Sequence, residues 1–429
     1  MSIYLFSLFV LLATGSIYVT FPVKNYIYLS SIFFAVMTLF LQILLSKFES
    51  RKLMLMTIKN MCILLLFMGI FSGYMLCQAQ YWQGNKGNLF LYLILFLFFI
   101  PIVWIYFSIF GYKYFIKSYN NVLFAICSIS LVLWICVSVL HIVSPSGYVN
   151  SGWATSGDYL PTFHNIYFET QNISFFGERI GKNSGIWPEA PMYAMAVSFG
   201  LLGEIYLLER KNKLIIFILS LTLLTTFTVS GLTILGLLAA DHVIRKSVLG
   251  SSSLVKFLIV IFTLLVGGCL GLLIFIIIRT KLNSGSGFIR LDDYLVGYKS
   301  FVKSPWIGHG FKNITYLTQF MNFGVRSFWK NGLLTFNTGI ANGWVQVFSD
   351  GGLLLGTVYV FTFVSGIISK NKTRNEHVLF VILFIMMFML IMNYTEMLLI
   401  FMIIALINTG TVYPHSDKFI SKNSIAKES

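Results

Sequence analysis

Two stretches of this sequence collect residues that could bind an anion and move a proton. Residues 279–341 carry eight Lys/Arg against two acidic residues, Asp292 and Asp293. Within this stretch His309 lies between two glycines, and an imidazole with an unperturbed pKa of about 6.5 can act as a base near neutral pH. Residues 144–190 carry Arg179, Lys182 and Glu189. The basic stretch predicts a site for an anionic ligand.

The composition indicates what must position these residues. The chain has 429 residues, of which 57% are hydrophobic and only 10% charged, so it is too apolar for an ordinary soluble domain. Apolar runs predict an all-α polytopic membrane protein with about twelve transmembrane helices. The predicted segments are helices 1–5 in residues 1–143, helices 6–9 in 191–278, helices 10–12 in 342–412, and a tail at 413–429. The apolar runs themselves are 3–21, 26–45, 57–77, 89–110, 122–143, 191–208, 214–228, 232–244, 254–278, 343–368, 378–392 and 397–412.

Charge decides both the count and the sidedness of these helices. Residues 214–244 read as a hairpin of two short helices broken near Ser230-Gly231, because basic residues flank both ends of the stretch. The short connectors at 46–56, 111–121, 209–213, 245–253 and 369–377 then share one side with the tail. They hold most of the Lys/Arg, so this side is predicted to be cytoplasmic, with both termini inside. The segments 144–190 and 279–341 become two large outer loops, and loops of this length are usually functional.

The second outer loop contains a predicted amphipathic helix. Leu291, Tyr294, Leu295, Tyr298, Phe301 and Val302 follow helical spacing. Asp292 and Asp293 fall on the polar side in the predicted first turn, where the helix dipole favours carboxylates. This helix should end before Pro305, because the residue before a proline is disfavoured in a helix. The chain then enters a turn, residues 307–311, whose glycines permit close approach to a ligand.

The order of these features resembles a known family. An Arg, an amphipathic helix, a Pro and a Gly-x-Gly-Phe turn, from Arg290 to Phe311, look like the second outer loop of the bacterial O-antigen and capsule repeat-unit polymerases, the Wzy family. The segment 182–191 is similar to their Arg-x-x-Gly-x-x-x-Glu-Pro motif, with Lys182 at the Arg position. Residues 341–353 resemble the entry to the following helix. Related O-antigen ligases have a His-Asn pair there, whereas this chain has Ala341 before Asn342, which favours a polymerase.

The resemblance implies a GT-C-like glycosyltransferase of the bacterial cytoplasmic (inner) membrane. Its donor and acceptor would be undecaprenyl-pyrophosphate-linked oligosaccharides, joined outside the membrane, with inversion, into O-antigen or capsule polysaccharide. A chain-length regulator protein is a possible partner, besides membrane lipid, and nucleic acid is not expected. The chemistry needs cations for the departing pyrophosphate and a base for the attacking hydroxyl.

These requirements assign roles to particular residues. Arg290 is the main catalytic and pyrophosphate-binding candidate. The further pyrophosphate-binding candidates are Arg179, Lys182, Arg326 and Lys312. His309 and Glu189 are the candidates for the base, and Asn342 and Trp187 are assigned to substrate binding.

His309 and Glu189 also have simpler explanations that involve no catalysis. His309 could be a surface residue without a role, and Glu189 could accept hydrogen bonds from the first turn of the following helix. No cofactor is expected, and neither is a metal, because Asp292 and Asp293 occupy adjacent helix positions and hard cations need several converging oxygen ligands. The alternative functions are an O-antigen ligase and, in a different class, a lipid-linked oligosaccharide flippase or transporter. Transporters usually carry ionisable residues deep in their helices, whereas Glu204, Asp241 and Glu396 lie near predicted helix ends.

Overall fold

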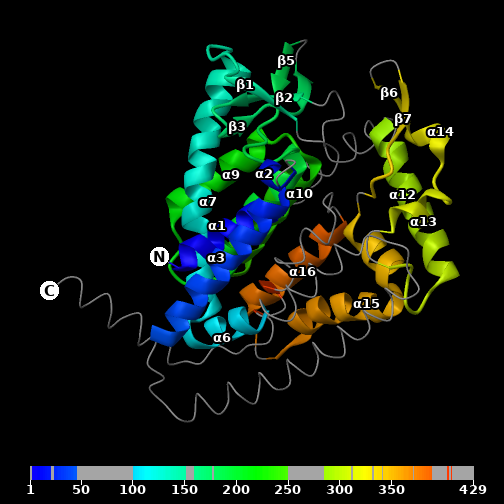
Figure 1. Cartoon of the computed structure of the whole chain (residues 1–429). Coiled ribbons are helices and arrows are strands. Elements are labelled where there is room, and N and C mark those ends of the chain that lie inside the picture. Colours follow the sequence, from blue (N-terminus) through cyan, green and yellow to red (C-terminus); the bar gives the residue numbers. More distant parts are fainter. Residues whose placement is uncertain are drawn as a thin grey trace.

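The structure, a computed structural model, is mostly helical in its described part (Figure 1). It describes residues 2–20, 24–45, 100–150, 159–175, 178–249, 285–310, 313–330, 333–340, 342–370 and 372–388, together with 403, 404 and 407. Two described helical segments, Tyr112–Val139 and Gly343–Ile368, are long and apolar enough to cross a membrane. This agrees with a helical membrane protein. The predicted spans at 57–77 and 254–278, most of 397–412 and the tail lie outside the described residues.

The other predicted apolar segments that fall in the described residues are found as helices. These helices are α1 (Ser2–Ala13), α3 (Lys24–Leu45), α6 (Ile100–Phe110), α7 (Tyr112–Trp134), α8 (Ala190–Tyr206), α9 (Lys213–Thr225), α10 (Val229–Leu249), α15 (Gly343–Ile368) and α16 (Arg374–Phe388). The helix that begins at Tyr112 starts ten residues before its predicted span at 122–143, so the connector predicted at 111–121 is mostly helical. The predicted first span is interrupted at Gly15, which has a φ of 87°, so that a short α2 (Ile17–Thr20) follows α1. α7 continues into a π-helical turn, η2 (Ile135–Val139). Apolar side chains from these helices form one large buried core.

The predicted helical hairpin is present. α9 and α10 are separate helices that pack together, joined by residues 226–228, slightly before the predicted break. Phe227 adopts a left-handed backbone conformation in the turn, with a φ of 47°. Asn212 caps α9 because its side-chain oxygen accepts from the backbone N–H of Leu214 at 3.0 Å.

Four of the polar connectors meet at one end of the helices. The Tyr112 hydroxyl lies 3.1 Å from a carboxylate oxygen of Glu376. Lys113 forms an ion pair with Glu209 at 2.5 Å. Arg245 donates a hydrogen bond to the side chain of Asn375. These contacts tie together the connectors predicted at 111–121, 209–213, 245–253 and 369–377.

The two segments predicted to be large outer loops contain short strands as well as helices, so the all-α prediction misses part of the local structure. The first loop forms an antiparallel sheet in the order β1-β2-β3 and a separate hairpin of β4 and β5. Its strands are β1 (Gly147–Asn150), β2 (Tyr159–Phe163), β3 (Tyr167–Phe168), β4 (Asn172–Phe175) and β5 (Glu178–Gly181). Aromatic and β-branched residues in these segments favour extended backbone.

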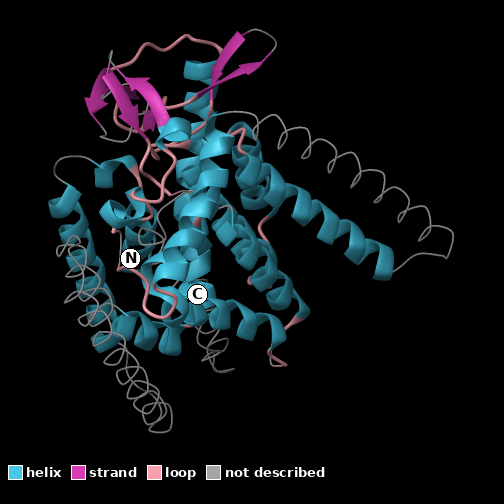
Figure 2. Cartoon of the chain, turned by 90° about the vertical axis from the view of Figure 1, so that its right-hand side faces the viewer, coloured by secondary structure: helices cyan, strands magenta, loops and turns pink. Residues whose placement is uncertain are grey.

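The second loop is built around one long helix. Its elements are α12 (Gly285–Lys303), α13 (Ile314–Thr318), α14 (Phe323–Arg326) and a hairpin of β6 (Ser327–Lys330) and β7 (Leu333–Phe336). α12 packs against α13, α14 and α15. The strands of both loops lie toward the same end of the molecule (Figures 1 and 2).

Candidate functional site

The apolar side of α12 is exposed on the surface of the protein, and its acidic side packs against the rest of the loop. Leu291 and Tyr298, on the predicted apolar face, are 49% and 68% exposed, whereas Asp293 is fully buried. The helix begins at Gly285, so the two aspartates lie beyond its first turn and the helix-dipole explanation for them is wrong. It ends at Lys303, before Pro305, as predicted. The helix is amphipathic as expected, and the structure shows that its acidic side is the buried one.

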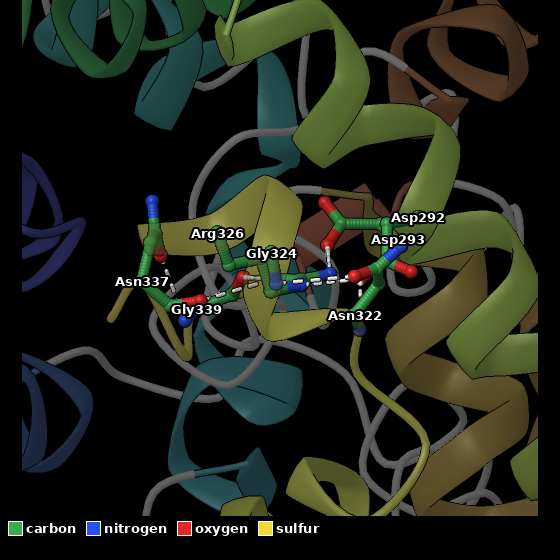
Figure 3. A network of polar contacts seen from close by, with 7 residues as sticks. All are labelled: Asp292, Asp293, Asn322, Gly324, Arg326, Asn337 and Gly339. Carbon is green, nitrogen blue, oxygen red and sulfur yellow. Dashed lines mark hydrogen bonds and ion pairs between the residues drawn. The ribbon is translucent and has the colours of Figure 1, made fainter. Parts of the chain in front are cut away.

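The buried aspartates bind Arg326 (Figure 3). Arg326 Nε lies 2.5 Å from Asp292 Oδ2, and Nη2 lies 2.5 Å from Asp293 Oδ1. Nη1 donates to the carbonyl oxygens of Asn337 and Gly339, at 3.2 and 3.0 Å. The two carboxylates therefore converge on one guanidinium, contrary to the expectation that they would not converge.

This network changes the role of Arg326. Its side chain is fully buried, and its single positive charge is shared by two carboxylates. A buried ion pair of this kind needs hydrogen bonds around it to offset desolvation, and the two carbonyls supply them. We therefore assign Arg326 to holding α12, α14 and the segment after β7 together, in place of the predicted pyrophosphate-binding role.

The glycine turn of the second loop fits into a break in α15. Within α15, Gly352 has a non-helical backbone with a φ of 57°. The amides of His309 and Gly310 donate to the carbonyl oxygens of Ser349 and Asp350, at 3.0 and 2.9 Å, and the Leu353 amide donates to Pro305 at 2.7 Å. A Cβ on Gly308 would come within 2.4 Å of the Asp350 backbone. The close approach that these glycines permit is thus to the chain itself, not to a ligand as predicted.

Contacts around the turn fix the orientation and the tautomer of the His309 ring. Its Nε2 lies 2.8 Å from the carbonyl oxygen of Ser300, and its ring stacks on Tyr316 with centroids 3.7 Å apart. Partial burial lowers the pKa of His309 below its ordinary value near 6.5, although the bond to Ser300 opposes this effect. Because a carbonyl only accepts, Nε2 must carry a proton. In the neutral ring, Nδ1 is then the basic atom.

The first loop brings Lys182 and Glu189 into electrostatic contact. Lys182 follows β5 and is half-buried, and Glu189 occupies the N-cap position of α8. Burial lowers the pKa of Lys182, and the nearby charge of Glu189 raises it in part. The Glu189 side chain makes no capping hydrogen bond to α8. The alternative role considered for Glu189, accepting hydrogen bonds from the first turn of the following helix, is therefore wrong.

The two residues assigned to substrate binding are both buried. Trp187 stacks on Tyr193 with centroids 4.7 Å apart, and its indole N–H has no hydrogen-bond partner within the described part of the protein. Asn342 caps α15: its Oδ1 accepts from the Val345 amide at 3.0 Å, and its Nδ2 donates to the Phe388 carbonyl at 3.1 Å. Asn342 therefore has a local structural role.

The remaining cationic candidates are only partly described. Arg290 lies half-buried on α12. Arg179 lies in β5 opposite Ser174, but its side chain is outside the described structure, as is the whole of Lys312. The structure thus brings Lys182 near Glu189 in the first loop. It does not bring Arg290 to His309, because Arg290 lies ten residues, about 15 Å along α12, before the Ser300 that binds His309.

Residues around His309 were missed by the sequence reasoning. Ser300, Asn313 and Tyr316 fix its ring and backbone, and Asn313 Nδ2 donates to the His309 carbonyl at 3.0 Å. Asn313 also caps α13. A signal was available, because Asn before a short helical segment is a preferred N-cap.

Comparison with known protein families, with curated proteins and with solved structures finds no match to this chain.

Proposed function

We propose that the chain is a repeat-unit polymerase of the Wzy type, which joins undecaprenyl-pyrophosphate-linked oligosaccharides into O-antigen or capsule polysaccharide. The proposed topology has about twelve membrane spans, with both termini in the cytoplasm and both large loops outside the cytoplasmic membrane. The order of the loop motifs supports it. The observation that carries it is the state of His309, a partly buried imidazole whose Nε2–H is bound to Ser300 and whose Nδ1 is left as a base.

The reaction assigns a task to each group. A sugar hydroxyl of the acceptor attacks the anomeric carbon of the donor glycan, and the bond from that carbon to the pyrophosphate oxygen breaks. The hydroxyl proton passes to His309 Nδ1, with the Glu189 carboxylate as the second candidate. Undecaprenyl pyrophosphate leaves, and the positive charges of Arg290 and Lys182, with Arg179 and Lys312, stabilise it. The mechanism uses no cofactor and no metal.

The transport alternative is less well supported. Glu204 is 2% exposed. Its carboxylate accepts from Asn120 Nδ2 and from the Asn212 amide, both at 2.7 Å. Asp241 forms an ion pair with Arg245 at 2.7 Å. Glu204 thus links the end of α8 to the start of α9, whereas Asp241 lies in the middle of α10, contrary to the prediction, and pairs with Arg245 of the same helix. Both contacts are a structural use of charge, and Glu396 lies outside the described residues.

The ligase alternative differs only in the acceptor, so products must separate it from polymerisation. Purified protein is incubated with one defined lipid-linked repeat unit and a chelator, with and without a lipid A core acceptor. We expect a ladder of multimers on the lipid carrier. Transfer only to the lipid A core would replace the proposal by a ligase, and no new glycosidic bond under either condition would refute it. Addition of a purified chain-length regulator should change the length of the ladder and not its presence.

A further inference from the structure

The exposed apolar side of α12 has no use in the reaction proposed above. Phe288, Leu291, Tyr294, Leu295, Tyr298 and Val302 are each 47% to 68% exposed. At 3.6 residues per turn they form a single stripe about 120° wide along the helix. Trp306 and Ile307, just after the helix, extend the exposed apolar surface. A monomer in water rarely exposes a contiguous apolar surface of this length without a partner.

The charges of α12 are divided between its two sides. Its acidic residues, Asp292 and Asp293, are buried and bound to Arg326. Lys299 and Lys303 are exposed along one edge of the apolar stripe, and the half-buried Arg290 lies beyond the opposite edge. Among the side chains of α12 that the structure describes, the exposed ones are therefore apolar or cationic.

We propose that this side of α12 rests on the membrane, with its apolar stripe among the outer ends of the acyl chains and its lysines at anionic phospholipid headgroups. A helix with a large apolar face, flanking Lys/Arg and aromatic residues is the type that binds the membrane interface. Anionic lipid is the occupant that matches both halves of the surface, because a second copy of this chain would bring the same positive charges together. The membrane is also close at hand, since α12 packs on α15, one of the two helices long and apolar enough to span it.

The contact would support the geometry of the second loop. α12 carries the Ser300 carbonyl that orients His309, and its buried side holds Arg326. Seating the outer side on lipid would fix the height of these groups relative to the membrane surface.

Photo-crosslinking in the full-length protein tests this placement. p-Benzoyl-phenylalanine is introduced at Tyr298 or, separately, at Leu295, and the protein is reconstituted in nanodiscs of phosphatidylcholine with or without phosphatidylglycerol. Gln319, exposed on the same loop at the end of α13, is the matched control position. After irradiation, adducts are identified by mass spectrometry.

We expect phospholipid adducts at Tyr298 and Leu295, enriched for phosphatidylglycerol, and few at Gln319. Replacing Lys299 and Lys303 with Gln should reduce the preference for phosphatidylglycerol by up to about fivefold per lysine. Crosslinks between two copies of the chain would assign the surface to self-association. Either that result, or equal lipid adducts at all three positions, or none at the two α12 positions in protein that elutes like the wild type, would overturn the proposal.

Discussion

Arg326 and Asp293, 33 residues apart in the sequence, form a buried ion pair whose two side chains are both fully shielded from solvent. The pair joins the middle of α12 to the end of α14. Together with Asp292 it joins α12, α14 and the segment after β7 into one packed unit.

Removing Arg326 should therefore destabilise the loop strongly. Arg326→Leu leaves two buried carboxylates without their cation, and we expect the free energy of unfolding of the loop to fall by about 3–5 kcal/mol. Pulse proteolysis of the purified protein measures this change. Lys299→Met, which removes an exposed cation from the same loop, should shift it by about 0.5 kcal/mol or less. Equal protease resistance in both variants would contradict the assigned role of Arg326.

The break in α15 depends on Gly352. An alanine Cβ there would lie 2.6 Å from the Trp306 backbone, at a φ of 57° that side chains disfavour. Gly352→Ala should cost at least about 1–2 kcal/mol from backbone conformation alone and lower the melting temperature. At Gly236 in α10 an added Cβ meets nothing within 4 Å, so Gly236→Ala should be neutral or stabilising by about 0.5–1 kcal/mol. The reverse order of melting temperatures would rule out the packing described for the turn.

The activity of the protein should fall in acid as His309 becomes protonated. Because burial lowers the pKa of His309, the midpoint of this acid limb should lie below pH 6.5. Tyr316→Ala uncovers the ring and should move the midpoint up toward 6.5. The measurement is the rate of ladder formation against pH, and an unchanged acid limb in His309→Gln would remove this residue as the base.

The same shift sets the direction of a stability change. The folded-state pKa of His309 is below the unfolded one, so its contribution is fully present above about pH 6.5 and is lost as the pH falls toward the folded pKa. As the pH falls over this range, the melting temperature of the wild type should thus decrease more than that of His309→Gln. Parallel pH profiles for the two proteins would show that the ring is not desolvated.

Arg290 is the cation on which the proposed chemistry depends most. Arg290→Ala should lower the rate of ladder formation by about 10²–10³-fold or more, the usual effect of removing a group that stabilises transition-state charge. Arg290→Lys should recover only part of the rate, since lysine lacks the two-pronged guanidinium. Lys213→Ala, an exposed cation at the start of α9, serves as the control and should leave the rate unchanged. Full activity in Arg290→Ala would exclude Arg290 from the mechanism.

Lys182 and Glu189 should be coupled electrostatically. Glu189 raises the pKa of Lys182 against the lowering effect of burial. Glu189→Gln should therefore lower that pKa further and increase the fraction of neutral amine. Site-resolved mass spectrometry of acetylation at pH 8–9 should show faster modification of Lys182, with Lys213 as an internal reference. A slower reaction at Lys182 would mean that the two side chains are not near each other in solution.

The sequence located several elements well because their signals are local. The helix 343–368 matches its predicted bounds, and the hairpin at α9 and α10 follows from basic residues at both ends. The end of α12 follows from Pro305. The short strands of the two large loops were not predicted, because their pairing depends on contacts between segments that no single window of sequence contains.

The sequence by itself determined that this chain is rich in apolar helices, that two long polar loops interrupt them, and that α12 is amphipathic. Only the tertiary structure decided which side of α12 faces inward, because helical spacing defines a stripe and does not say whether protein or lipid covers it. It also decided that Arg326 pairs with both Asp292 and Asp293, and that the glycines around His309 fit against α15. These outcomes depend on charges and backbone atoms distant in sequence, which only folding brings within a few ångströms of one another.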